Sequence, residues 1–313
     1  MGLFLVNWIG ERKIFMDKQD RTTKRYVFVT LLNVIITIAE FFGGIISGSL
    51  SLLSDAVHNL SDVGAIVLSF VAHLIGKRNR NKNKTFGYQR AETLVAFTNG
   101  VILIVISLVL FIEAIERFWK PEHIKGGVML VVALIGLIAN FISMFAMHRD
   151  AKGNLNVRST FVHMMSDALS SLAVVIGAIF IYFWKIDWLD PILTMLVSLF
   201  VLHEAYEITM KATNVLMESN PDIDLKKINQ IVLSYPEVKN IHHVHIWRYS
   251  DDYIMLDAHL NVDKNLTCGE FEDLCQRIGR ELKDQLGVNH INLQEECERG
   301  RNDKMIVERG KEN

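Results

Sequence analysis

Six long apolar runs limit the possible folds of this chain more than any other feature of its 313 residues. They cover about residues 26–48, 50–75, 91–115, 126–147, 159–183 and 191–210. Each run reaches the roughly 20 residues that an α-helix needs to cross the hydrocarbon core of a bilayer. We therefore expect a domain of six transmembrane helices that occupies residues 25–212.

The loops between these runs predict the orientation of the chain. The N-terminal segment, residues 1–24, and the loops after the second and fourth runs are rich in Lys and Arg. Basic loops favour the cytoplasmic side of a membrane, so we expect both termini in the cytoplasm. The loop after the third run also carries three basic residues, Arg117, Lys120 and Lys125, which weakens this bias.

The composition separates a membrane part from a soluble part. Half of the residues are hydrophobic and the mean hydropathy is +0.23, values too high for an ordinary soluble domain but too low for a chain that is apolar throughout. The net charge of −2 argues against a nucleic-acid-binding protein. We expect the soluble part at residues 213–297, followed by a disordered, charged tail at 298–313.

The soluble part has the pattern of a small α+β domain. We predict a helix from Pro221-Asp222 to about Ser234, strands at Val238–Tyr249 and Tyr253–Val262, a helix from about Thr267 to Leu286, and a last strand at Val288–Gln294. Thr267 and Glu270 form the Thr-x-x-Glu capping box that opens the second helix. The order αββαβ indicates a small sheet with helices on one face.

Two copies of one motif, His-x-x-x-Asp, lie inside the apolar runs, at His58 to Asp62 and at His163 to Asp167. Residues four apart lie on the same face of a helix, so each motif presents an imidazole beside a carboxylate. Two such helices in contact offer two nitrogens and two oxygens to one point, a set that suits a tetrahedral ion such as Zn²⁺.

A simpler interpretation exists for each motif alone, because single polar residues inside membrane helices also serve packing. A lone Asp at the centre of a membrane helix costs about 2.5–3.5 kcal/mol on insertion scales. Two copies at identical spacing on different runs favour a metal site. The other polar residues in the apolar runs, Glu40, Asn99, Asn140 and His203, are expected to serve packing or to lie at the membrane interface.

Histidines also gather in the soluble part, at positions 242, 243, 245, 259 and 290. Side chains alternate along a strand, so His290 and Glu296 are expected on the same side of the last strand. A second metal site and a solvated polar face explain these residues almost equally well.

Taken together, these residues resemble the cation diffusion facilitator family, and more closely its bacterial zinc, cadmium and cobalt efflux members. The resemblance extends from about residue 25 to 297. It is carried by Ser-Leu-Leu-Ser-Asp-Ala-Val-His-Asn-Leu-Ser-Asp (51–62), Thr-Phe-Gly-Tyr-Gln-Arg-Ala-Glu (85–92), His163-x-x-x-Asp167, Asp190-Pro191 and His-His-Val-His-Ile-Trp (242–247).

The resemblance implies a homodimer in the plasma membrane (the inner membrane of a bacterium), with a metallochaperone-like, ferredoxin-like cytosolic domain. It also implies proton-coupled export of a divalent metal ion from the cytoplasm, with no organic cofactor. His58, Asp62, His163 and Asp167 match the transport site of the family, and His58 favours Zn²⁺ while leaving Cd²⁺ and Co²⁺ open. His242, His259, His290 and a carboxylate at Glu295 or Glu296 match its cytosolic metal site; the strand-face argument favours Glu296. Arg90 and Glu218 match a charge pair of the family.

Two departures from the family pattern concern metal delivery. The loop after the fourth run has only one histidine, His148, and residues 77–88 contain no His, Asp, Glu or Cys. Neither loop is therefore expected to deliver metal.

Two other classes of function would use some of the same residues. An intramembrane metalloenzyme would need an open metal position and a general base, for which Asp55 is the spare carboxylate in its span, but no His-Glu-x-x-His motif occurs. A membrane metal sensor or regulator would use the C-terminal histidines without transport and would not need the intramembrane motifs.

Overall fold

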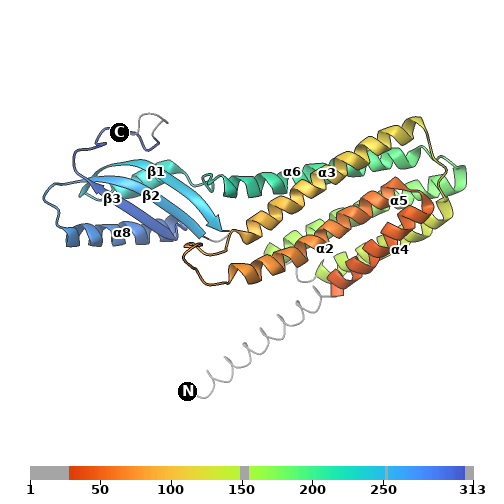
Figure 1. Ribbon diagram of the computed structural model, residues 1–313, viewed down its shortest axis with the longest axis horizontal. Coiled ribbons are helices and arrows are strands. Elements are labelled where there is room, and N and C mark those ends of the chain that lie inside the picture. The colour runs from red at the N-terminus through yellow and green to blue at the C-terminus, as the bar shows by residue number, and fades with distance from the viewer. Residues whose placement is uncertain (1–27, 149–154, 251–252, 307–313) are drawn as a thin grey trace, which may run out of the picture. The chain divides into compact units, whose positions relative to one another are not determined.

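The computed structural model describes residues 28–148, 155–250 and 253–306 (Figure 1). Within these residues six helices are long and apolar enough to cross a membrane, as predicted. They are Phe28–Ser47, α2 (Leu50–Gly76), α3 (Ala91–Trp119), α4 (Gly126–His148), α5 (Leu155–Trp184) and α6 (Leu189–Leu216). The predicted segment 1–24 lies outside the described residues.

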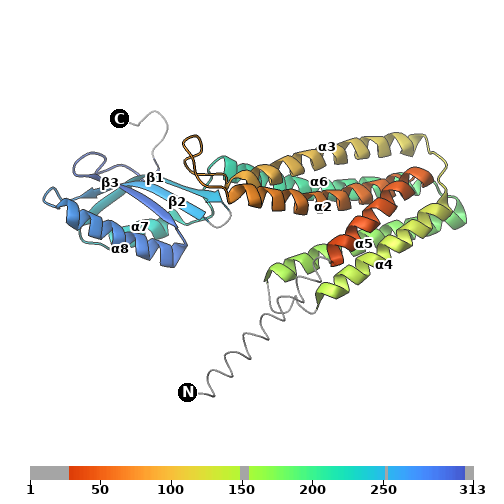
Figure 2. The same ribbon diagram turned by 60° about the horizontal axis from the view of Figure 1, so that its bottom comes forward.

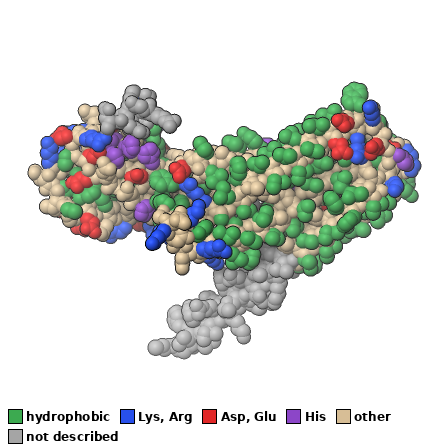
Figure 3. Space-filling view, in the orientation of Figure 1, with side chains coloured by type: hydrophobic (Ala, Val, Ile, Leu, Met, Phe, Trp, Pro, Cys, Tyr) green, Lys and Arg blue, Asp and Glu red, His purple; other side chains and the backbone are tan. Residues whose placement is uncertain are grey.

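Exposed apolar side chains cover these helices (Figure 3). Examples are Phe70, Phe145 and Phe183, each more than 60 % exposed. So much apolar surface in water would be unfavourable, whereas lipid tails solvate it without cost. The burial pattern therefore agrees with helices that face lipid.

The contacts divide the chain into two compact units. One holds the described residues up to Phe70 together with Thr98–Ile208, and the other holds Val71–Phe97 together with the chain from Thr209 onward. In the first unit, α4 and α5 run side by side in both ribbon views (Figures 1 and 2). A buried cluster that includes Leu52, Met129, Val174 and Ile181 joins α2, α4 and α5.

Asp190 fixes the start of α2 from a distant part of the chain. Its carboxylate accepts hydrogen bonds from the backbone N–H groups of Leu50 and Ser51, at 2.8 and 3.2 Å, and from the hydroxyls of Ser49 and Ser51, at 2.6 and 2.5 Å. Asp190 is fully buried. The first N–H groups of a helix lack partners inside the helix and carry partial positive charge, so a carboxylate there satisfies and stabilises them.

The predicted αββαβ order of the soluble domain that follows α6 is confirmed. Its elements are α7 (Leu225–Leu233), β1 (Val238–Ser250), β2 (Tyr253–Val262), α8 (Cys268–Leu286) and β3 (His290–Glu296). The sheet order is β1-β2-β3, with β1 antiparallel and β3 parallel to β2. Helices α7 and α8 cover one face of the sheet (Figure 2) and enclose a core that includes Ile228, Leu260 and Leu274.

Two elements of this domain start later than predicted, for local reasons. Helix α7 begins after Asp224, whose side chain caps it, and not at Pro221-Asp222, because Asp222 has a positive φ of 62°. Strand β3 begins at His290 and not at Val288, because Gly287 ends α8 in the left-handed conformation and Val288 is buried against the core. The predicted capping box at Thr267 and Glu270 is present.

Residues 298–306, part of the tail that the sequence predicts to be disordered, make hydrogen bonds with the preceding domain. The side chain of Asn261 donates to the carbonyl of Arg299 at 2.7 Å, and that of Asn240 donates to the carbonyl of Gly300 at 3.2 Å. The backbone N–H of Val244 donates to the carbonyl of Met305 at 2.8 Å, and Met305 packs on the core. Composition alone could not show these partners. Residues 307–313 lie outside the described residues.

We expect Asp190→Ala to lower the stability of the membrane unit by about 2–3 kcal/mol, because four donors lose a charged acceptor in a buried site. Thermal unfolding of the purified protein in detergent measures this loss. Asp187→Ala is the matched control. Within the described residues, the ion pair of Asp187 is with the exposed ring of His123, at 3.2 Å, and such exposed pairs contribute little to stability. Equal losses in the two variants would contradict the capping role.

Candidate metal sites

Helices α2 and α5 bring the two His-x-x-x-Asp motifs together. Asp62 Oδ2 lies 3.0 Å from His163 Nε2 and 3.7 Å from His58 Nε2. Asp167 lies 3.5 Å from His58 Nε2 through Oδ1 and 3.8 Å from His163 Nε2 through Oδ2. One donor atom from each of the four residues lies within 4.8 Å of all the others. The structure thus places the predicted transport-site residues in one group.

These distances suit a tetrahedral zinc ion. Zinc bonds to His nitrogen and carboxylate oxygen are about 2.0–2.2 Å long, which places neighbouring ligand atoms of a tetrahedron about 3.3–3.6 Å apart. The four contacts above, from 3.0 to 3.8 Å, bracket this range. Asp167 Oδ1 is also buried with no hydrogen bond to a described residue, which leaves this oxygen available to bind a metal ion.

The group is buried on one side and open on the other. His58 and Asp167 are only 6 % exposed, and a cavity of about 160 Å³ borders His58, Asp62 and His163. The cavity is lined by His58, Asp62, Leu103, His163, Val201, Glu204, Glu207 and Ile208. An ion in this cavity would therefore meet His58, Asp62 and His163, and Asp167 lies 3.5 Å from the His58 ring.

Glu204 on α6 is the residue of this site that the sequence interpretation missed. Its Oε2 lies 4.0 Å from His58 Nε2, and its side chain lines the cavity. An acidic residue within the apolar run 191–210 was the available signal. Nothing in the sequence shows that α6 presents it to α2, because that depends on how the helices pack.

Several other intramembrane polar residues are held by hydrogen bonds. Ser170 and Ser171 donate to the two oxygens of Asp55 at 3.4 and 3.3 Å, and Asn59 donates to Glu40 at 2.8 Å. The side chain of Asn140 donates to Ser171 at 2.8 Å. Asn99 pairs with Ser61 in the same way, so the expected packing role of both asparagines is supported by these contacts.

A second group of possible ligands lies on the sheet. His242 on β1 faces His259 on β2, and Glu296 on β3 contacts both rings, with Oε2 at 3.1 Å from His242 Nε2 and Oε1 at 3.2 Å from His259 Nδ1. Burial is the largest influence on the pKa of His259 and lowers it, which favours the neutral imidazole that binds metal. Three such donors fit a zinc ion with one further position for another ligand.

The structure distinguishes among the other candidates for this site. Glu295 lies opposite Leu260 and its charge acts on Cys275 of α8, whereas Glu296 meets the two histidines. His290 lies opposite Met255 at the far end of β3, six residues and about 20 Å from Glu296 along the strand. Within one chain His290 is therefore apart from the group, and its role as a ligand stays a prediction.

Comparison with known proteins identifies the family. Residues 27–217 match the family model of the cation efflux transmembrane domain, and residues 220–297 match that of the cation efflux protein cytoplasmic domain. The chain belongs to the cation efflux, or cation diffusion facilitator, family. The expected resemblance is confirmed.

Several proteins with names of metal cation transporters are similar to this chain over most of its length. A cadmium, cobalt and zinc/H(+)-K(+) antiporter of Bacillus subtilis is 37 % identical over 86 % of this chain and 88 % of its own length. The zinc transporter ZitB of Escherichia coli is 34 % identical over 89 % of this chain and 88 % of its own. The metal cation efflux system protein CzcD of Cupriavidus metallidurans is 35 % identical over 82 % and 81 %.

These relatives are transporters of metal cations, and the six apolar helices make this cation efflux protein a multi-pass membrane protein. The comparisons give no support to the alternative of a metal regulator without transport, and they argue against an enzyme. The predicted pair of Arg90 and Glu218 is present at 3.0 Å.

We expect Glu296→Gln to weaken zinc binding at the sheet roughly tenfold or more, because the charged oxygen between two imidazoles is lost. Glu295→Gln removes the same charge one residue away and should leave the affinity within about twofold. Calorimetric zinc titration of the full chain measures both, in an Asp62→Ala/Asp167→Ala background that silences the membrane group. A larger loss with Glu295→Gln would assign the ligand role to Glu295.

Proposed function

We propose that this protein exports Zn²⁺ from the cytoplasm in exchange for protons, with Cd²⁺ and Co²⁺ as further substrates. The observation that carries the proposal is the group of two imidazoles and two carboxylates inside the membrane helices, with donor atoms that all lie within 4.8 Å of one another. The named substrates of the relatives support the choice of metals.

Protons are the natural counter-ion for such a site. Imidazole and carboxylate hold a metal only when deprotonated, so protons that reach His58, Asp62, His163 or Asp167 compete directly with zinc. A site open to one side of the membrane at a time would then release zinc on the side where protons bind. The antiporter name of the Bacillus relative supports exchange.

We further propose a homodimer with both termini in the cytoplasm. The match to the family's cytoplasmic domain and the basic N-terminal segment support this orientation. In this arrangement His242, His259 and Glu296 would bind cytoplasmic zinc. The fourth ligand of the zinc ion would come from the partner subunit. His290 of the same chain would then be free to serve another copy.

Zinc uptake into proteoliposomes under an imposed pH gradient tests the exchange. We expect the wild-type rate to rise with the gradient, and Asp62→Ala and Asp167→Ala each to reduce uptake to the level of protein-free liposomes, because each removes one of four ligands. Asp187→Ala lies outside the group and serves as the control. Uptake that persists in both ligand variants would refute the assignment of the transport site.

Glu204→Gln should raise the KM for zinc about fivefold with little change in kcat. A charge about 4 Å from the site contributes on the order of 1 kcal/mol to the attraction of a cation in a wet cavity, and about 1.4 kcal/mol corresponds to a factor of ten. Initial uptake rates over a range of zinc concentrations separate the two constants. Glu207→Gln, in the same cavity, should change KM less, because Glu207 pairs with His203 at 3.5 Å. A larger effect there would contradict the role of Glu204.

A further inference from the structure

A basic hollow lies on the loop between α2 and α3. Its volume is about 540 Å³, and it is lined by Gly76, Lys77, Arg78, Asn79, Arg80, Phe86, Gly87 and Gln89. Three of these residues are cations and none is acidic. Two more cations, Lys82 and Lys84, follow in the same loop. The hollow therefore offers concentrated positive charge and hydrogen-bond donors to an anion.

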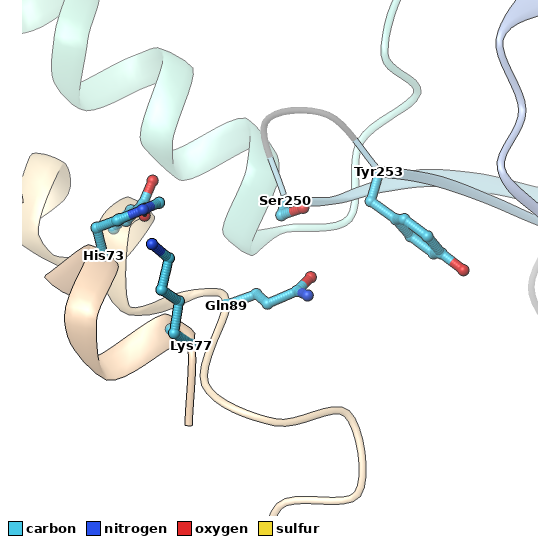
Figure 4. A pocket seen from close by; sticks show the side chains of 7 residues that line it. His73, Lys77, Gln89, Ser250 and Tyr253 are labelled. Carbon is cyan, nitrogen blue, oxygen red and sulfur yellow. The ribbon is translucent and has the colours of Figure 1, made fainter. Parts of the chain in front are cut away.

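The five cations of this loop have no acidic partner among the described residues. Each of them is exposed. Arg90, just after the loop, is different, because Glu218 pairs with it at 3.0 Å. The neighbouring hollow, shown in Figure 4, contains Glu92, but this carboxylate pairs with His73 at 2.9 Å. None of the five cations therefore forms an ion pair with an acid that the structure describes, and they remain available to an anion.

Hydrogen bonds hold the loop in shape. The side-chain oxygen of Asn81 accepts from the backbone N–H groups of Asn83 and Lys84, both at 2.9 Å, and its amide donates to the Tyr88 hydroxyl at 2.9 Å. The hydroxyl of Tyr249 donates to the carbonyl of Phe86 at 2.6 Å. Gly87 has φ of +87°, which glycine adopts without strain. A loop fixed in this way presents its cations with little loss of entropy on binding.

The hollow directly follows the lipid-facing end of α2. Val71 and Leu74 near this end are exposed and apolar, as expected of side chains in contact with lipid. Lys77 comes three residues after Leu74, which is about 4.5 Å along a helix. The cations therefore lie at the depth where lipid headgroups begin.

We propose that this hollow binds the phosphate-bearing headgroup of an anionic phospholipid. Arg78 and Arg80 supply planar guanidinium groups, which pair with two phosphate oxygens at once, and Lys77 adds a third positive charge. Basic clusters directly after a transmembrane helix also attract anionic lipid surfaces. The proposal depends on the membrane location of the protein but not on the metal that it transports.

Native mass spectrometry of the full-length protein, titrated with phosphatidylglycerol or phosphatidylcholine, tests this site. We expect the wild type to prefer phosphatidylglycerol. Arg78→Gln/Arg80→Gln should lower the affinity for this lipid about tenfold or more, because both guanidinium groups that pair with the phosphate are lost, and should leave the affinity for phosphatidylcholine unchanged. Lys82→Gln/Lys84→Gln removes the same charge from residues that do not line the hollow and should change the affinity less than about threefold.

Three results would overturn the proposal. Equal losses in the two double variants would show diffuse attraction by net charge, and equal binding of both lipids would show that no anionic headgroup is selected. Inorganic phosphate that displaces phosphatidylglycerol at equal concentration would identify a free anion as the ligand. The melting temperature of each variant checks that the protein still folds. Arg78→Lys/Arg80→Lys keeps the charge and should bind phosphatidylglycerol more tightly than Arg78→Gln/Arg80→Gln does.

Discussion

Carboxylates among apolar helices organise the membrane unit of this protein. A charge in such surroundings is costly unless a partner compensates it. Removing one member of a buried pair is therefore strongly destabilising, because it leaves the other charge without a partner. Asp190 is compensated by the start of α2, Asp55 by two serine hydroxyls of α5, and Glu40 by the amide of Asn59. Each of these contacts joins segments that are distant in the sequence, so the polar groups also determine which helices meet.

Asp62 and Asp167 differ from these structural carboxylates. Their partners are His58 and His163, whose rings can be neutral or charged, and a cavity leads to the group. Such a group is stable in two ways, with protons on the rings or with a divalent cation among the four donors. The same requirement for compensation that makes the other carboxylates structural makes this group suitable for exchange.

The domain after α6 is stabilised in the usual way of a domain in water, by a buried apolar core. Its core of aliphatic residues from α7, α8 and the sheet provides the stability, and its histidines lie where β1, β2 and β3 pair in register. Residues 298–306 pack on this domain through Asn240 and Asn261, although they lie beyond the segment that matches the family's cytoplasmic domain. This extension is a feature that the family resemblance did not predict.

The sequence by itself determined the features that depend on local periodicity. Apolar length predicted six spans, the i, i+4 spacing predicted which side chains share a helix face, and Thr267 with Glu270 predicted a helix start, because each signal lies within a few turns of chain. Only the tertiary structure decided that α2 meets α5, that Glu204 joins the cavity and that Asp190 caps a helix about 140 residues earlier in the chain. It also showed that Glu296, and not Glu295, contacts His242 and His259, and that His290 lies away from these two histidines. These contacts depend on how helices pack and strands register over long range, for which a single sequence carries no local signal.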